Sequence, residues 1–416
     1  MSPASSQQAL TTAERLLNAD DVLTAVPTAA SASLARGLAG TALLHARLSL
    51  TDPAFEAAAV RHWAAAAHAT RHGDSSAGTY HSPGGLAASL IIGAGYLPDP
   101  VSQRAVTTRA SRWLSARAID LARRHRERLH AGGTGTPWAV YDTITGLAGT
   151  GRVLLAALAS GHETSEPGLM AALDTLTAMI LARHGNRPGW WLPASAHPAA
   201  VTVHPSGTAT TGMAHGIAGP LALLSISQTA GWAVAGQRTA IQDAAQWLLH
   251  WGTNLSWPPY VTGDELDSAT TSRTSGRRDA WCYGAPGIGR ALSLAGHALG
   301  NPRLTEAGNA AIAALADRAA SRWDVDGPTL CHGRAGVLQC AAASHAATAD
   351  RAAAAVTAAF NPQQAFAFQH LDEKGCAFDE PGFLTGAAGV ALVLADHGEL
   401  PAPAVPARWD SLLLLS

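Results

Sequence analysis

The chain has 416 residues, of which 47% are hydrophobic and 14% charged, so it is long enough to bury a large core. Its 28 basic and 30 acidic residues give a net charge of −2, which excludes the basic surface typical of proteins that bind nucleic acid or anionic membranes. No run of 18 apolar residues and no signal-peptide pattern occurs, so the sequence predicts a cytoplasmic protein without a membrane span.

A short pattern of two glycines three positions apart, followed by an apolar helical run, recurs along the chain. Its seven copies begin at Gly37, Gly85, Gly146, Gly216, Gly284, Gly333 and Gly386. The second copy is degenerate, because Ala88 stands in place of its second glycine. A spacing of 48 to 70 residues between copies is typical of a repeat architecture.

Ala-rich amphipathic segments lie between the copies, for example at 169–182 and 240–251. Each repeat therefore predicts two helices, one that starts at the glycines and one that leads to the next copy. Stacked helix pairs bury one continuous core. We predict an all-α fold, a seven-repeat α/α toroid in a single domain over residues 1–416, which we expect to be closed because its end repeats lack an obvious polar cap.

Two of the connections are long insertions. Residues 185–212 and 252–280 combine Trp-Pro motifs with β-branched runs, which predicts short strands or ordered loops. Long loops in a compact domain are usually functional or disordered, and both of these lead directly into glycine copies. The basic segment 114–130 predicts a helix whose arginines either face solvent or dock a peptide partner.

Four cysteines in a chain of this length do not form a disulfide framework. In a reducing compartment they are typical of metal binding or catalysis. Cys340 lies in an apolar run and Cys376 in a predicted loop, and we interpret both as structural. Cys282 and Cys331 each lie close to a glycine, in the motifs WCYG and CHG, and are the candidates for chemistry.

Alignment of the seven copies on their first glycine explains the distant cysteines. Immediately before that glycine stand Arg36, Gly84, Thr145, His215, Tyr283, His332 and Thr385. One position earlier stand Ala35, Pro83, Ile144, Ala214, Cys282, Cys331 and Leu384. Cys282 and Cys331 share one position in adjacent repeats, so a toroid would place them side by side at one end of its inner helices.

Cys282, Cys331 and His332 together offer two thiols and one imidazole. Zinc binds both donor types readily, and three protein ligands leave a fourth position open for water or substrate. The register therefore predicts that these three residues can meet on one zinc ion.

Other reactive residues lie near the same position. His215 stands immediately before the fourth copy, Asp142 four residues before the third, and Arg278 four residues before the cysteine of the fifth. His215 could instead be a hydrogen-bonded histidine at a helix start, and Asp142 a helix cap. Tyr283 and Trp281 could simply line the core.

The segments RDAWCYGAPG, CHGRAG, AHGIAGP and YDTITGLAG, with the seven glycine copies, resemble the lanthipeptide cyclases of the LanC family over nearly the whole chain. The resemblance implies a seven-fold α/α toroid with one catalytic zinc. It also implies addition of a cysteine thiol in a precursor peptide to dehydroalanine or dehydrobutyrine, which forms lanthionine or methyllanthionine rings. Some members carry an extra small domain within the toroid, and residues 96–137 are long enough for a reduced version at most.

By this resemblance the zinc ligands are Cys282, Cys331 and His332. The acid/base pair and the two further residues near the zinc are Asp142, His215, Arg278 and Tyr283.

The proposed chemistry requires these residue types. The thiolate is the attacking species, and coordination to zinc deprotonates a thiol. Attack on Cβ of the dehydro residue creates an enolate, which needs charge stabilisation and then a proton at Cα. His215 is the best general acid by its pKa, with Asp142 to orient it or to accept the thiol proton. Arg278 would hold the enolate oxygen, and Tyr283 would assist either step.

The chain has no room for a fused dehydratase, so we expect a separate dehydratase and a dehydrated, leader-bearing precursor peptide as partners. A LanC-like enzyme that adds glutathione to dehydrated residues is one alternative, with the same zinc ligands. A protein prenyltransferase-like toroid typically uses an Asp ligand, and the CHG motif argues against it. A non-catalytic peptide-binding scaffold that retains zinc is the alternative from a different functional class.

Overall fold

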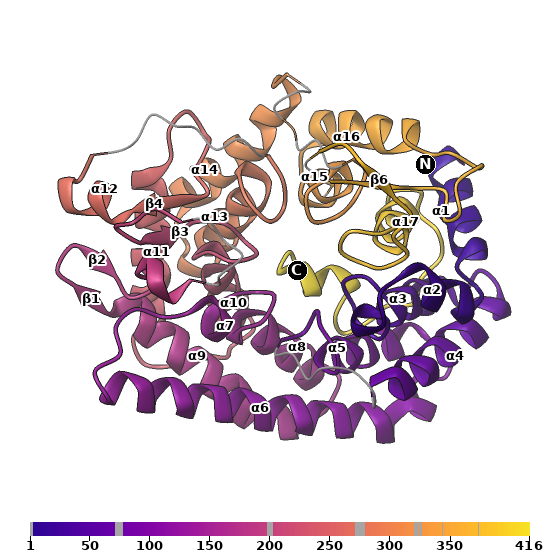
Figure 1. Ribbon diagram of the computed structural model, residues 1–416, viewed down its shortest axis with the longest axis horizontal. Coiled ribbons are helices and arrows are strands. Elements are labelled where there is room, and N and C mark those ends of the chain that lie inside the picture. Colours follow the sequence, from indigo (N-terminus) through magenta and orange to yellow (C-terminus); the bar gives the residue numbers. More distant parts are fainter. Residues whose placement is uncertain are drawn as a thin grey trace.

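The computed structural model describes residues 3–70, 78–197, 203–270, 279–319, 323, 327–342, 344–372 and 374–416. The helices form a closed double ring in which inner helices surround a common centre and outer helices cover them (Figure 1). The predicted all-α fold, an α/α toroid with a few short strands, is confirmed.

Every inner helix begins at one of the glycine copies. The seven inner helices are α3 (Leu38–Leu48), α5 (Gly84–Gly93), α8 (Leu147–Ala159), α10 (Ala218–Thr229), α13 (Ala285–Leu299), α15 (Arg334–Ala341) and α17 (Ala387–His397). Each packs against the next, and α17 packs against α3 to complete the circle. All 11 residues of α3 and all 10 of α5 are buried, because each inner helix is enclosed by its neighbours in the double ring.

The outer helices pack against the inner helices of their own repeats. They are α4 (Pro53–Thr70), α6 (Arg104–His130), α9 (Glu166–Leu181), α11 (Gln237–Trp251), α14 (Pro302–Ala313), α16 (Ala346–Ala358) and α1 (Pro3–Arg15). Because α1 packs against α17, the first helix of the chain completes the last repeat. The stretch that we considered for a reduced extra domain is mainly α6, a single helix of 27 residues. Within the described residues, no helix has the length and apolar character needed to cross a membrane.

Shorter elements connect the repeats. The remaining α-helices are α2 (Ala19–Ala25), α7 (Trp138–Tyr141) and α12 (Gly263–Ser268). The strands are β1 (Arg183–His184), β2 (Arg187–Pro188), β3 (Thr208–Thr210), β4 (Tyr260–Thr262), β5 (His370–Leu371) and β6 (Ala377–Phe378). The 3₁₀ turns are η1 (Thr28–Ala30), η2 (Ala94–Tyr96), η3 (Pro100–Gln103), η4 (Glu163–Ser165), η5 (Ala194–Ala196), η6 (Ala314–Ala316) and η8 (Trp409–Leu413).

A belt of backbone hydrogen bonds joins the loops that precede the inner helices. The Ala214 amide donates to Cys282 O (3.2 Å), the Cys282 amide to Cys331 O (3.3 Å), and the Cys331 amide to Leu384 O (2.9 Å). The Leu384 amide donates to Ala35 O (2.8 Å), which links the last repeat to the first. The other three joints are Ala35 to Tyr80, Thr79 to Ile144 and Thr143 to Ala214. The ring is thus closed through its backbone as well as through helix packing.

Close packing explains the second glycine of the repeated motif. A Cβ on Gly149 would lie 1.9 Å from Thr143 O, and one on Gly336 would lie 2.1 Å from Leu330 O. In each case the blocked carbonyl lies six residues earlier, in the loop that carries the belt. The same approach occurs at Gly40, Gly219, Gly287 and Gly389. A larger residue would push this loop away from the helix that follows it.

The two predicted insertions meet beside the ring. Strand β3, in residues 185–212, pairs antiparallel with β4, in residues 252–280, with Thr208 opposite Thr262. Thr262 also accepts the amide of Glu265 and so caps α12. The expected short strands are present, and they join two segments that are distant in the sequence.

The C-terminal segment lies inside the ring, at its centre (Figure 1). Turn η8 and the leucines that follow it are buried. Two inner-ring residues from the fifth repeat hold its backbone: Trp281 Nε1 donates to Leu413 O (2.9 Å), and Arg290 Nη2 donates to Leu415 O (2.8 Å). On the opposite wall, the Tyr80 hydroxyl donates to Leu412 O. The segment therefore lies across the middle of the toroid.

Candidate active site

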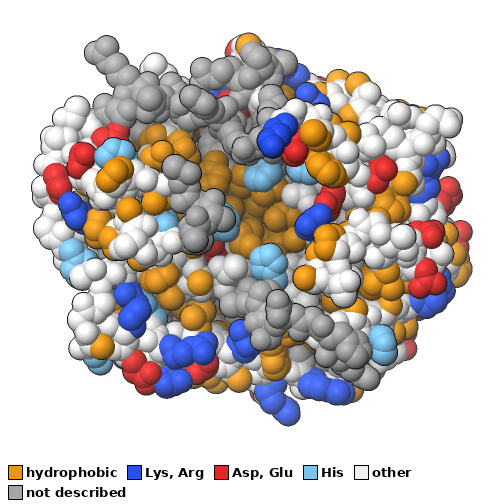
Figure 2. Space-filling model, in the orientation of Figure 1, with side chains coloured by type: hydrophobic (Ala, Val, Ile, Leu, Met, Phe, Trp, Pro, Cys, Tyr) orange, Lys and Arg blue, Asp and Glu red, His pale blue; other side chains and the backbone are white. Residues whose placement is uncertain are grey.

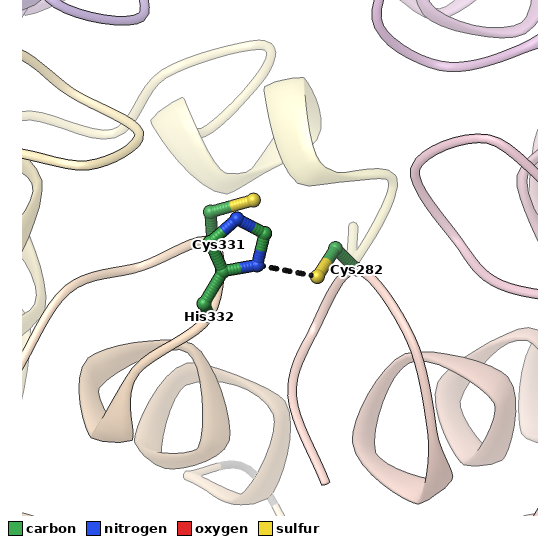
Figure 3. Close-up of side chains that lie close together, drawn as sticks. All are labelled: Cys282, Cys331 and His332. Atoms are coloured by element: carbon green, nitrogen blue, oxygen red, sulfur yellow. Dashed lines mark hydrogen bonds between the residues drawn. The ribbon is translucent and has the colours of Figure 1, made fainter. Parts of the chain in front are cut away.

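The belt brings the two candidate cysteines and His332 together. The possible ligand atoms of Cys282, Cys331 and His332 all lie within 4.8 Å of one another. Cys282 Sγ lies 2.9 Å from His332 Nδ1, and Cys331 approaches from the neighbouring loop (Figure 3). The two cysteines are almost fully buried, whereas His332 is half-buried. One side of the cluster is thus accessible from the centre of the ring.

The donor set fits a zinc ion. In tetrahedral zinc sites with bonds of about 2.0–2.3 Å, neighbouring ligand atoms lie ~3.5–3.8 Å apart. The three donors already lie within 4.8 Å, so small side-chain rotations bring them to those separations. Three protein ligands leave one position for a substrate atom. No second group of this kind occurs among the described His, Cys, Asp and Glu residues.

The other two cysteines lie apart from this cluster. Cys340 is buried on α15, and burial raises the pKa of its thiol to about 12. Cys376 is exposed, in the hairpin between β5 and β6. All four cysteines are described, and none forms a disulfide. Cys340 thus has the burial of a structural residue.

Asp142 and His215 form a hydrogen-bonded pair in adjacent repeats. His215 Nδ1 lies 2.6 Å from Asp142 Oδ2. Asp142 is fully buried, and its other oxygen accepts the amides of Thr145 (2.6 Å) and Gly146 (2.8 Å). Oδ1 thus holds the loop before α8, whose N-cap is Gly146 without a side-chain cap hydrogen bond, while Oδ2 is used by the histidine. The His215 side chain is 32% exposed.

Tyr283 lies next to both groups. Burial raises the pKa of its phenol well above the ordinary value of 10.0, and the charges of Cys282, Tyr141 and Asp142 add to the effect. Tyr283 is therefore a neutral phenol that can donate a hydrogen bond. Gly212 gives it room, since a Cβ there would lie 2.5 Å from the Tyr283 ring. Arg278, the remaining candidate, lies outside the described residues.

The positions directly before the glycine copies line the centre of the ring. Six of the seven are partly exposed, although the residues around them are mostly buried: Arg36, Thr145, His215, Tyr283, His332 and Thr385. Figure 2 shows a hollow at the centre of the molecule, with hydrophobic side chains at its bottom and histidines beside it. One register position thus carries a partly exposed polar side chain in most of the repeats.

Sequence reasoning missed two neighbours of the Asp142–His215 pair. His81 lies close enough to interact electrostatically with both residues. Burial lowers the pKa of His81, the charge of Asp142 raises it, and the charge of His215 lowers it further. It stands four residues before Gly85, as Asp142 does before Gly146, so the register contained a signal for it. Trp138 stacks on the His215 ring, with centroids 5.0 Å apart. It lies outside the register, and no repeat pattern could have found it.

Comparisons with known proteins agree with this architecture. The family pattern described as "Lanthionine synthetase C-like protein" matches residues 28–414. The nisin biosynthesis protein NisC of Lactococcus lactis subsp. lactis is 28% identical over 200 residues, and this match covers 46% of each chain, or about half of that relative. The solved structure of nisin cyclase superposes with a TM-score of 0.78 at 19% identity, over 97% of this chain and 96% of that one. The family match spans most of the chain, and the protein belongs to the lanthionine synthetase C-like family.

Proposed function

We propose that the protein is a zinc-dependent lanthionine cyclase. It would add cysteine thiols of a dehydrated precursor peptide to dehydroalanine or dehydrobutyrine and so form thioether rings. The observation that supports this proposal most directly is the three-donor cluster of Cys282, Cys331 and His332 beside the Asp142–His215 pair. A thiol-activating group and a proton carrier then face the same hollow.

Cys282, Cys331 and His332 would hold the zinc ion through two sulfurs and one nitrogen. Zinc bound there lowers the pKa of a coordinating substrate thiol, so that the nucleophilic thiolate is present near neutral pH. The two cysteines are almost fully buried, which keeps bulk water away from the sulfur side of the site.

His215 is the proposed proton carrier. Because Asp142 holds Nδ1, Nε2 is the ring nitrogen left to exchange a proton with the substrate. Formation of the C–S bond at Cβ moves an electron pair towards the adjacent carbonyl, and His215 would donate a proton to Cα. The substrate thiol loses one proton and Cα gains one, so the reaction needs no other reactant.

Tyr283 is the described residue best placed to stabilise charge on the substrate carbonyl. Its raised pKa keeps the phenol protonated, and a protonated phenol donates a hydrogen bond to a developing enolate oxygen. Arg278 is proposed for the same oxygen on the family resemblance alone.

The proposed partners follow from the substrate. Dehydro residues arise by dehydration of serine and threonine, so a separate dehydratase would act first on a leader-bearing precursor peptide. We also propose that the reaction takes place in the cytoplasm, and that residues 1–416 form one domain.

Incubation of the zinc-loaded protein with a dehydrated precursor peptide tests the function. Ring formation leaves the peptide mass unchanged but removes thiols, so alkylation followed by mass spectrometry should show fewer alkyl groups than in a control without enzyme. A parallel incubation that adds glutathione separates the main alternative, because each glutathione addition increases the peptide mass. Thiols that all remain alkylatable, with no glutathione adduct, would favour a non-catalytic scaffold.

A further inference from the structure

We propose that helix α7 (Trp138–Tyr141) is a positioning element for His215, and that the Trp138 indole sets the plane of the imidazole. This inference rests on the proposed proton-carrying role of His215. The helix has only four residues, and the chain continues from it directly into Asp142. Three residues of this five-residue segment, Trp138, Tyr141 and Asp142, thus contact His215.

The first contact is made by the indole ring. Trp138 and His215 stack with ring centroids 5.0 Å apart and an interplanar angle of 21°. The hydrogen bond from Nδ1 to Asp142 fixes one atom of the imidazole but permits the ring to tilt about that bond. A stacked indole removes this freedom, because a tilted imidazole would collide with the indole face. Trp138 and Asp142 together define where Nε2 points.

The second contact holds the backbone of the histidine. The Tyr141 hydroxyl donates to His215 O (3.0 Å), and Thr210 Oγ1 donates to the same oxygen (2.7 Å). The two hydroxyls also lie 2.8 Å apart, so each limits the movement of the other. The main chain that carries the imidazole is therefore held at its carbonyl from α7 and from β3.

The indole is also contacted by a second histidine. His197 packs edge-on against Trp138, with centroids 5.3 Å apart and an angle of 86°, and its Nε2 lies 3.0 Å from Thr208 Oγ1. Thr208 and Thr210 are the two ends of β3, which pairs with β4. This gives the two insertions a role: their small sheet supports both the indole and the carbonyl of His215.

Substitutions at Trp138 test the positioning role. Trp138→Phe keeps an aromatic face and should retain most of the cyclisation rate. Trp138→Leu keeps apolar volume but no flat face, and kcat should fall about tenfold or more, as misorientation of a reacting group commonly costs. KM and zinc content should stay near wild-type values, because neither the hollow nor the cluster loses a group. Tyr141→Phe should lower kcat less, since Thr210 still holds the carbonyl.

Trp232→Leu is the matched control. Trp232 is also partly buried, but it follows the C-terminal end of α10, whereas His215 precedes the N-terminal end. The 12 residues of this helix separate the two ends by ~18 Å. Trp232→Leu should leave kcat unchanged. An equal loss in Trp138→Phe and Trp138→Leu, or a loss that follows zinc content, would overturn the positioning role.

A spectroscopic measurement separates this inference from the proposed function. In protein labelled at histidine ¹³Cε1, the His215 signal is identified by its loss in His215→Gln. The stacked indole should shift that signal upfield, and Trp138→Leu should abolish the shift while Trp232→Leu leaves it. If wild type shows the shift but closes no rings, the function fails and the stack stands. If Trp138→Leu changes neither signal nor kcat, the positioning role fails and the function stands.

Discussion

Asp142 serves two different groups with its two oxygens. Oδ1 accepts the Thr145 and Gly146 amides and so fixes the loop before α8, while Oδ2 holds His215 Nδ1. A carboxylate can only accept there, so the histidine must donate from Nδ1. The tautomer of His215 and the shape of the loop thus depend on one buried side chain.

Removal of His215, the proposed proton carrier, should leave the proposed zinc site intact. His215→Ala should keep its zinc, since His215 lies outside the three-donor cluster, yet cyclisation should slow by about 10²–10⁴-fold, the usual contribution of general acid/base catalysis. Asp142→Asn should act in the same direction but more mildly, because it disturbs the tautomer and leaves the imidazole in place. Exposed His204 provides the control, and His204→Ala should behave as wild type. Loss of zinc in proportion to activity in His215→Ala would make that residue a ligand instead.

Metal content should depend on two of the four cysteines. We expect about one zinc per purified chain, with most of it lost in Cys282→Ala and in Cys331→Ala because each removes one of three donors. Cys340→Ala is the matched control, since this buried thiol lies on α15 away from the cluster. Elemental analysis of the purified variants measures the difference. Full zinc in Cys331→Ala would refute the assignment.

At the scale of elements, the inner helices and their loops act as one unit. Each second glycine lets its helix start in contact with the loop that bears the belt. In the sixth repeat the carbonyl in contact with Gly336 belongs to Leu330, the residue before Cys331. The motif therefore links helix packing directly to the position of a candidate ligand.

Gly336→Ala should disturb both stability and metal binding. The new Cβ would lie 2.1 Å from Leu330 O, so the loop that carries Cys331 and His332 must move. We expect a loss of ~2 kcal/mol or more in the free energy of unfolding, as is typical of overpacking a core, together with weaker zinc binding. Gly95→Ala is the control, because its Cβ meets only ordinary contacts at 3.7 Å, and surface changes cost ~0.5 kcal/mol or less. Urea titration of both variants, with and without a chelator, measures the free energy of unfolding and its dependence on metal. Equal losses in Gly336→Ala and Gly95→Ala would contradict this argument.

Repeat periodicity was enough to predict the inner helices and the meeting of Cys282, Cys331 and His332, because both follow from one register. The roles of these residues in binding and catalysis stay predictions. The pairing of α1 with α17 and the C-terminal segment at the centre could not be predicted, since neither belongs to a repeat. The stack of Trp138 on His215 depends on how two loops meet in space, which no spacing encodes.

At the scale of the whole molecule, two neutral histidines are built into the first repeat. His45 is fully buried on α3 with Nε2 3.0 Å from Leu16 O, and its ring meets His62 of α4 edge-on at 5.0 Å. His62 Nε2 lies 3.2 Å from Leu17 O. Burial lowers the pKa of His45 to about 3 and that of His62 to about 4. The pair ties the segment after α1 to the double ring, and burial keeps both rings neutral at neutral pH.

The protein should therefore lose stability in mild acid. An unfolded histidine titrates near pH 6.5, so below that pH the unfolded chain binds protons that the folded chain excludes. The stabilisation is complete above pH ~6.5 and is lost as the pH falls towards the folded pKa values of about 4 and 3. The urea midpoint should fall steeply between pH 6.5 and 4. His62→Gln should flatten this dependence, and a midpoint independent of pH over that range would contradict the argument.

The position of the C-terminal segment also bears on how a long peptide substrate would reach the proposed site. Trp281 and Tyr80 hold the C-terminal segment from opposite walls, so this segment lies across the centre of the ring. Under the proposed function, we expect each reacting stretch of peptide to enter and leave the hollow from the same side. Only a short loop of the proposed peptide substrate would have to enter at a time, and thioether bridges already made elsewhere on it would stay outside the hollow. One-sided access of this kind would let a single proposed site close several rings of different size in succession.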